Sequence, residues 1–436
     1  MDVPSKSAVP SPPAGPGSSP KTAPRLPFVE LVALTAAVMA LNALAIDMML
    51  PALGQIGADL GALHDNDRQL IIVIYVVSNG VAQLFFGPLV DRFGRKRVLM
   101  WSLAGYVTGS LLSVVAATFS MLLAARAFQG VMTAATRVAV IAIVRDQCAG
   151  RKMAEVMSLA ITIFMAAPIL APGLGQLILL AFPWRGIFLA LLAYGLVLTV
   201  WVGLRAPETL APENRKTLRP GAVAAAYATF LRNRISIGYT LVSALCFGAL
   251  FGYISAAEQI FLETFELGQN FAIAFAAIAA SLGTATLINA RLVSRFGMRR
   301  LCHGALIVFL ATSLAHLAVA GSSGETFLLF MAFMSVAFFC LGLIGPNCTA
   351  MAMEPMGQNA GAAAAATGFA GTTIAGLIGG IIGRFYDGTT MPILIGFATL
   401  GLFALAAALW TEKGRLFQPH AQAPEEAQAP EETQAQ

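Results

Sequence analysis

The chain has 436 residues, of which 58% are hydrophobic and only 11% are charged, and its mean hydropathy is +0.76. Soluble domains carry about 25% charged residues, so this composition excludes a soluble globular protein and indicates an integral membrane protein. The net charge is +5. If the N-terminus is cytoplasmic, 22 of the 27 Lys and Arg residues fall on the cytoplasmic side. The positive-inside rule requires this asymmetry, so the basic charge gives no support to nucleic-acid binding.

Apolar windows of about 20 residues can cross the hydrocarbon core as helices. The predicted membrane helices cover residues 28–53, 69–90, 98–118, 121–144, 154–182, 187–204, 236–261, 271–293, 301–320, 326–349, 361–382 and 391–410. These runs are solidly apolar instead of alternating, which favours helices over barrel strands. We therefore predict an all-α membrane protein with twelve transmembrane helices and both termini in the cytoplasm.

Polar segments divide the chain into parts. Residues 1–27 are rich in Pro, Ser and Gly and are predicted to be a disordered cytoplasmic tail. Residues 411–436, in which AQAPEE occurs twice, are predicted to be a low-complexity cytoplasmic tail. Three prolines and six bases mark residues 205–235 as a cytoplasmic linker. This linker separates an N-terminal six-helix half, 28–204, from a C-terminal six-helix half, 236–410.

A loop motif repeats between the two halves. Residues 89–97 read LVDRFGRKR, and 203 residues later residues 292–300 read LVSRFGMRR. Both copies follow the second predicted helix of their half. Two pseudo-symmetric halves that rock about a central site are the expected arrangement, so alternating access is the leading mechanism.

Three motifs resemble those of the major facilitator superfamily over about residues 28–410. The first copy of the loop resembles that family's loop between helices two and three, through Gly87, Asp91, Arg92, Gly94, Arg95 and Lys96. RAFQG, which begins at Arg126, resembles its intramembrane arginine motif. APILAPGLG, residues 167–175, resembles its antiporter motif through Pro168, Pro172, Gly173 and Gly175, with Gln176 where a further glycine is usual.

AIDMMLPA at 45–52, Arg145-Asp146 and WRGIF at 184–188 resemble the bicyclomycin and chloramphenicol-resistance branch of drug and proton antiporters. The resemblance implies a monomer in the bacterial cytoplasmic (inner) membrane that exports small amphipathic drugs, with the proton as coupling ion and without a catalytic site, cofactor or metal. Export or import of a metabolite, such as a sugar or an amino acid, remains an alternative. A membrane enzyme or sensor is a remote one, because the connections are short and lack His or Cys clusters.

Four charged residues qualify as intramembrane functional candidates, because a charge inside the bilayer costs about 2.5 to 3.5 kcal/mol to insert. They are Asp47, Arg126, Arg137 and Glu258. Asp47 and Arg126 lie at comparable depth in the outer half. Desolvation makes a carboxyl group bind a proton more readily, and a nearby cation does the opposite. We predict that Asp47 carries the proton and that Arg126 tunes it; a static ion pair is the alternative.

The other candidates also have two readings each. Arg137 follows Arg126 by eleven residues, which returns to the same helix face roughly 16 Å further inward. It either lines the cytoplasmic half of the cavity or snorkels to the headgroups. Glu258 is expected to be a solvated helix-end residue, with a second protonation site as the alternative. Tyr75 and Asn79 share one face of helix two and contact either substrate or neighbouring helices.

The repeated loop predicts a gate. Gly87 and Gly94 are expected to allow a tight turn. As the resemblance implies, Asp91 faces the N-terminal end of helix eleven in the outward-facing state. The second copy has Ser294 in place of Asp91, so the latch should be one-sided. The glycines of helix eleven predict close packing, and the five cysteines are expected to pack as small hydrophobic residues.

Overall fold

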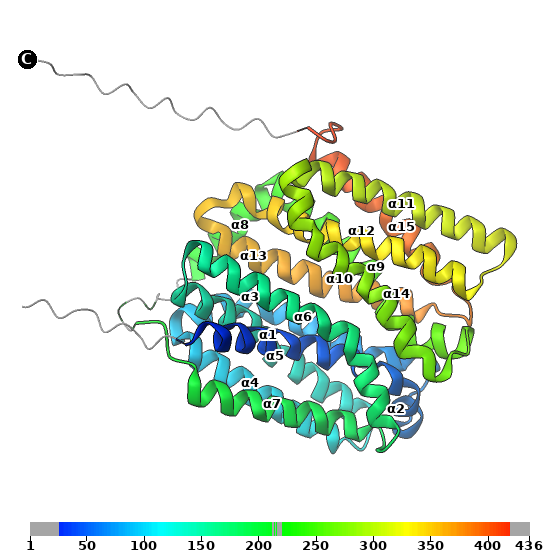
Figure 1. The fold of residues 1–436 in the computed structure, drawn as a ribbon, viewed down its shortest axis with the longest axis horizontal. Helices are drawn as coiled ribbons and strands as arrows, with labels where there is room; N and C mark the ends of the chain where they lie inside the picture. The colour runs from blue at the N-terminus through cyan, green and yellow to red at the C-terminus, as the bar shows by residue number, and fades with distance from the viewer. Residues whose placement is uncertain (1–25, 212, 214, 216–219, 419–436) are drawn as a thin grey trace, which may run out of the picture.

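The computed structural model describes residues 26–418 apart from 212, 214 and 216–219, so most of both predicted tails lies outside the described residues. Long helices form two groups (Figure 1). The N-terminal group contains α1 (Phe28–Asp47), α2 (Leu53–Leu60), α3 (Leu70–Phe93), α4 (Arg95–Val114), α5 (Phe119–Gln147), α6 (Gly150–Leu179) and α7 (Arg185–Arg205). The C-terminal group contains α8 (Pro220–Arg232), α9 (Arg234–Gln259), α10 (Phe271–Phe296), α11 (Met298–Ser323), α12 (Phe327–Met353), α13 (Ala360–Phe369), α14 (Ala375–Arg384) and α15 (Met391–Thr411).

The predicted number of membrane helices is confirmed for the described chain. Eleven stretches are long and apolar enough to cross a membrane. The twelfth helix is α4, which begins with three basic residues and packs against α5 and α7. α13 and α14 form one span that is joined by a π-helical turn, Ala370–Ile374.

The first predicted helix is shorter than expected. It ends at Asp47, and a 3₁₀ turn, Leu50–Ala52, leads into α2. Pro51 has no N–H group that could bond to the carbonyl of Asp47 four residues earlier, so the α-helix cannot continue through it. The carboxyl group of Asp47 therefore lies at a break between two helical segments.

The two groups are packed in the same way. In the N-terminal group, α5 contacts α1, α3 and α4, and α4 contacts α7. In the C-terminal group, α12 contacts α9, α10 and α11, and α11 contacts α15. The equivalent helices follow each other in the same chain order. The prediction of two pseudo-symmetric six-helix halves is thus confirmed.

Two equivalent contacts join the halves. α3 packs against α13 and α14, and α10 packs against α6, so the pseudo-twofold axis exchanges one contact for the other. Glycines make the first contact close: a Cβ atom on Gly376 would lie 2.8 Å from Cγ1 of Val76 on α3. On the opposite face, a Cβ atom on Gly379 would lie 2.6 Å from the carbonyl carbon of Phe251 on α9. The close packing predicted for helix eleven is confirmed.

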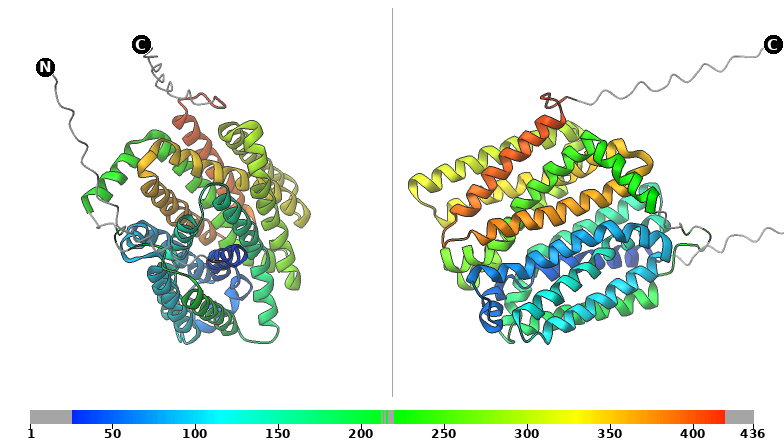
Figure 2. Two further views of the ribbon diagram at one scale, coloured as in Figure 1. Left: turned by 60° about the vertical axis from the view of Figure 1, so that its left-hand side comes forward. Right: turned by 180° about the vertical axis from the view of Figure 1, so that it is seen from behind.

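The two ends of the bundle carry different elements (Figures 1 and 2). α2 and the short helix Asp65–Gln69 lie at one end, here named the α2 end. α8 lies at the opposite end, named the α8 end. α8 is a helix inside the predicted linker that the sequence did not indicate, and it packs on α13. The hydroxyl group of Tyr227 on α8 donates to the carbonyl oxygen of Leu84 on α3 at 3.0 Å, so this segment touches both halves.

Candidate functional site

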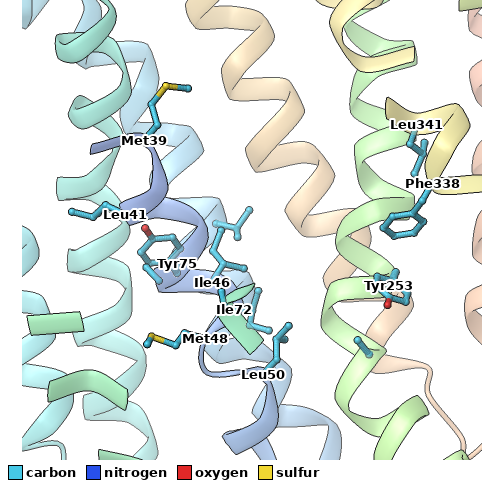
Figure 3. Close-up of a cluster of buried hydrophobic side chains, with 14 of the residues drawn as sticks. Met39, Leu41, Ile46, Met48, Leu50, Ile72, Tyr75, Tyr253, Phe338 and Leu341 are labelled. Carbon is cyan, nitrogen blue, oxygen red and sulfur yellow. The ribbon is translucent and has the colours of Figure 1, made fainter. Parts of the chain in front are cut away.

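Asp47 is a buried carboxyl group that faces the other half. Its residue is 4% exposed, and its Oδ1 atom has no hydrogen-bond partner among the described residues. Tyr253 on α9 interacts electrostatically with it. The Tyr253 ring packs against Phe338 with the centroids 4.7 Å apart, and Figure 3 shows these two rings across from Ile46, the neighbour of Asp47. A charge here is expensive because no described group compensates it.

Arg126 is fully buried and ties three helices of the N-terminal half together. Its guanidinium group donates to the carbonyl oxygens of Ala45 on α1 at 2.9 Å and of Ile71 on α3 at 3.3 Å. It also donates to Oε1 of Gln129 at 2.5 Å and lies 4.3 Å from the ring centroid of Tyr75. Carbonyl dipoles and an aromatic face thus stabilise the positive charge without a carboxylate.

Asp47 and Arg126 lie near each other in the fold but do not form an ion pair. No ion pair or hydrogen bond between them is present in the described part of the chain. The contact of Arg126 is instead with the carbonyl group of Ala45, two residues before Asp47. The static ion pair considered above is therefore not formed in this structure. Arg126 holds the last turn of α1, and through it the position of Asp47.

Tyr75 and Asn79 are both buried and hydrogen-bonded between helices. The hydroxyl group of Tyr75 donates to Oδ1 of Asn42 on α1 at 2.6 Å. Nδ2 of Asn79 donates to the carbonyl oxygen of Gly130 on α5 at 3.1 Å, and Oδ1 of Asn79 accepts from Gln83 at 2.9 Å. In this conformation, Tyr75 and Asn79 therefore contact neighbouring helices, which is the second of the two roles considered for them. Their contact with a substrate stays a prediction.

The motif on α6 packs directly behind Asp47. Pro168 and Pro172 both lie inside α6. A Cβ atom on Gly175 would overlap the carbonyl group of Met48, the residue after Asp47. Gly173 lies near α10 of the other half: an ideal Cβ atom on Gly173 would be 3.8 Å from Cβ of Ala272. Gly175 is therefore the residue that lets α6 approach the break after α1, and a larger side chain would displace it.

A set of polar residues joins the two halves at the α2 end, and we name it the inter-half cluster. It consists of Asn66, Asp67, Arg68 and Gln69 from the N-terminal half with Glu258, Gln259, Glu263 and Arg384 from the C-terminal half. Every described ion pair between the halves belongs to this cluster. The halves are thus fastened at the α2 end.

Arg68 is the centre of the cluster. Its Nε atom is 3.3 Å from Oε2 of Glu258, and its Nη2 atom donates to Glu263. The side chain of Glu258 is only 6% exposed, so the expectation of a solvated helix-end residue is wrong. α9 carries Glu258 inward against α2, where an ideal Cβ atom on Gly54 would lie 2.9 Å from both the Glu258 and the Arg68 side chains. Gly54 thus makes room for this buried pair.

Further contacts join the two halves beside the ion pairs of Arg68. Oδ1 of Asp67 is 2.9 Å from Nη1 of Arg384. Nδ2 of Asn66 donates to the carbonyl oxygen of Arg384 at 2.9 Å. Gln69 donates to Gln259 and, at 3.0 Å, to the carbonyl oxygen of Gly383. These bonds reach the ends of α9 and α14, so the cluster joins the N-terminal half to two helices of the C-terminal half.

The repeated loop forms a charged cluster at the α8 end. Arg95 lies 3.3 Å from Oδ1 of Asp91 and 2.9 Å from Oδ2 of Asp146, measured from its guanidinium nitrogens. Glu208, which the sequence did not indicate, accepts from the backbone N–H of Arg95 at 2.9 Å and so caps α4. Gly94 has φ 103°, and an added Cβ atom would overlap the carboxylate of Glu208. Only glycine therefore fits this turn.

The first copy of the loop also contains Gly87, Arg92 and Lys96. Gly87 lies inside α3, so the prediction that it helps to form a turn is wrong; the helix continues through Pro88 to Phe93. Lys96 donates to the carbonyl oxygen of Gly203 at the end of α7, at 2.9 Å. Arg92 lies over the ring of Phe93, 5.4 Å from its centroid. The contact of Asp91 with the start of helix eleven stays a prediction.

The second copy of the loop has a different set of partners. Ser294 donates to the carbonyl oxygen of Arg291 in its own helix at 2.8 Å. Arg299 lies 3.1 Å from Glu354 and 3.2 Å from Glu412. At the position of Asp91, therefore, only the first copy of the loop has an acid that pairs with the arginine four residues later; a latch at this acid stays a prediction.

Arg137, the cysteines and two surface grooves lie apart from these clusters. Arg137 is exposed on α5, in the part of that helix nearer the α8 end. The five cysteines are free and buried, as predicted for small hydrophobic residues. One surface groove lies between α9 and α15 near Trp410, and another lies between α3 and α5 near Val131. Both are lined by apolar side chains and carry no polar group that would orient a ligand.

An all-helical bundle of two equivalent halves, with buried charges at the contact between them, is the architecture of a membrane transporter. The family model of the Major Facilitator Superfamily matches residues 35–383. The chain belongs to the major facilitator superfamily.

Similar proteins support this membership. The chain is 26% identical over 374 residues to the bicyclomycin resistance protein homolog of Haemophilus influenzae, covering 84% of this chain and 90% of that protein. It is 30% identical over 369 residues to the multidrug resistance protein MdtL of Klebsiella pneumoniae, covering 83% and 91%. The crystal structure of the human organic anion transporter MFSD10 (TETRAN) has the same fold, with a TM-score of 0.65, 16% identity and coverage of 88% and 100%.

Proposed function

We propose that this transporter exports small amphipathic drugs in exchange for protons, by alternating access to a site between its halves. The observation that carries the proposal is Asp47, an uncompensated buried carboxyl group at the helix break after α1, facing Tyr253 of the other half. The relatives named for bicyclomycin and multidrug resistance support drugs as substrates. The packing of Gly175 on Met48 supports antiport, because it joins the motif on α6 to the residue after Asp47.

The orientation follows from the charges. With both termini in the cytoplasm, the α8 end is inside and the α2 end is outside, in a bacterial cytoplasmic membrane. The inter-half cluster then fastens the two halves on the outer side. Rocking to the outward-facing state requires Arg68 to leave Glu258 and Glu263. Repacking at α9 changes the surroundings of Asp47, so the same motion can alternate its affinity for a proton.

A susceptibility panel tests this function. Expression in a bacterial host stripped of its own efflux pumps is expected to raise resistance to a phenicol, to bicyclomycin or to lipophilic drugs. The protein must first be shown to reach the membrane. If resistance to every compound stays unchanged, drug export is wrong, and export or import of a sugar or amino acid becomes the proposal to test.

Asp91→Asn is expected to impair transport without preventing insertion. The substitution removes the charge that Arg95 contacts at 3.3 Å and leaves Asp146 as its remaining acid. Drug efflux from cells is expected to fall about tenfold, the effect of roughly 1.4 kcal/mol on the closure of the α8 end. Ser294→Ala at the equivalent site should have little effect, because Ser294 bonds only within its helix. Equal damage by the two substitutions would show that the latch is not one-sided.

A further inference from the structure

Arg137 lies near the middle of the membrane. α5 runs from Phe119 to Gln147, a length of 29 residues, so its midpoint is residue 133. Arg137 is four residues beyond this midpoint toward the α8 end, or about 6 Å along the axis. The hydrocarbon core is about 30 Å thick, so this is the level at which transporters of this architecture hold their substrates.

The side chain of Arg137 is exposed at a position of α5 whose neighbours one turn away are buried. These neighbours are Thr133, Ala134 and Val140. A lipid-facing position would expose them as well, so Arg137 is on the side of α5 that turns toward the other helices, where an exposed side chain lines the space between them. Arg137 also shares a helix face with Arg126, which points between α1 and α3.

The charge of Arg137 is uncompensated. Among the described residues it has no ion pair, no hydrogen bond and no aromatic ring beneath it. The buried arginines, in contrast, all have partners: carbonyl groups and Tyr75 hold Arg126, and carboxylates hold Arg68, Arg95 and Arg299. An unpaired guanidinium group at this depth is costly, and a ligand that supplies the missing negative charge would recover that cost.

We propose that Arg137 binds an anionic group of the transported molecule, a carboxylate, sulfonate or phosphate, and so selects amphipathic anions over amphipathic cations. A guanidinium group donates two parallel hydrogen bonds to such a group, which fixes orientation as well as charge. The apolar remainder of the substrate would then lie against the aliphatic and aromatic side chains of both halves. This assignment rests on the proposed function for the existence of a transported molecule, but binding to Arg137 needs no proton gradient.

Two fluorescent dyes with the same ring system test the charge preference. Fluorescein is anionic, and tetramethylrhodamine methyl ester is cationic. Binding of each dye to the purified full chain in lipid nanodiscs is measured by fluorescence anisotropy, without a pH gradient. The unsubstituted protein is expected to prefer fluorescein. Arg137→Gln is expected to weaken fluorescein binding by roughly ten- to a hundredfold, the size of one charge-assisted pair of hydrogen bonds, and to leave the rhodamine ester unaffected.

Two further variants separate charge from fold. Arg137→Lys should retain part of the fluorescein binding, because the charge remains while the second parallel hydrogen bond is lost. Arg232→Gln removes an exposed arginine at the end of α8 and should change neither dye. The proposal is overturned if the unsubstituted protein shows no preference for fluorescein, or if Arg137→Gln affects the two dyes equally. Failure of export with intact Arg137-dependent binding would instead count against the proposed function alone.

Discussion

Asp47→Asn is expected to abolish proton-coupled drug transport and to leave the protein folded in the membrane. Asn has the same shape but cannot take up or release a proton. Because Oδ1 of Asp47 has no hydrogen-bond partner among the described residues, the substitution breaks no described bond. The melting temperature should therefore stay the same or rise. Drug-induced proton movement in inverted membrane vesicles is expected to fall to the level of vesicles without the transporter.

Asp65→Asn is the matched control, because Asp65 is an exposed acid in the short helix at the α2 end. It removes one carboxylate by the same chemical change and should leave proton movement intact. Asp47→Glu keeps a titratable group and should retain part of the activity. Full proton-coupled efflux by the Asp47→Asn variant at normal expression would show that Asp47 is not the proton carrier.

Arg68→Gln is expected to open the α2 end. It removes the cation from two carboxylates, one of which is almost fully buried. A loss of about 1 to 3 kcal/mol from the closed state shifts the closed-to-open ratio by roughly five- to a hundredfold. Ser255→Cys is a suitable reporter, because Ser255 is 2% exposed and lies one turn before Glu258. Its labelling by a membrane-impermeant maleimide added outside intact cells should increase accordingly.

Controls for this experiment lie at the same end of the bundle. The five native cysteines are buried and should give a low background. Asp387→Asn removes a carboxylate that bonds only to Thr389 in its own loop; those bonds hold the pKa of Asp387 below its usual value, so it is charged. This variant should leave labelling unchanged. Adding Glu258→Gln to Arg68→Gln removes the stranded buried charge and should reverse part of the opening. Equal labelling of the Arg68→Gln and Asp387→Asn variants would contradict a latch at Arg68.

The fold could be predicted from the sequence because its causes are local. A membrane helix is defined by a continuous apolar run, and the repeat of the loop at 89–97 marks the duplication. Even the early end of α1 has a local cause in Pro51, although the apolar run continues past it. The glycines of helix eleven indicated close packing for the same reason, since the absence of a side chain is visible in the sequence itself.

Of the candidate site, the sequence could indicate only those residues whose charge is costly to bury in a membrane. That cost singled out Asp47, Arg126, Arg137 and Glu258 as functional candidates. Their partners could not be predicted, because the pairs join distant parts of the chain: Arg68 and Glu258 are 190 residues apart. The surroundings of Glu258 were therefore predicted wrongly.

Tyr253 and Glu208 were missed for a related reason. A tyrosine inside an apolar helix and an acid in a polar linker look ordinary until the fold brings each beside a charge or a free backbone N–H group. Gly87 was misjudged because a glycine near a loop resembles a turn residue, whereas the helix in fact passes through it.

Proton-coupled drug export by this protein can be measured in proteoliposomes that contain only the purified transporter. A proton gradient is imposed across the vesicle membrane with the membrane potential clamped, and movement of a drug found in the susceptibility panel is followed. The drug is expected to move against the direction of proton flow, a protonophore should stop this movement, and Asp47→Asn protein should not support it. Drug movement that follows only the drug's own gradient, at equal rates with and without the proton gradient, would contradict the account.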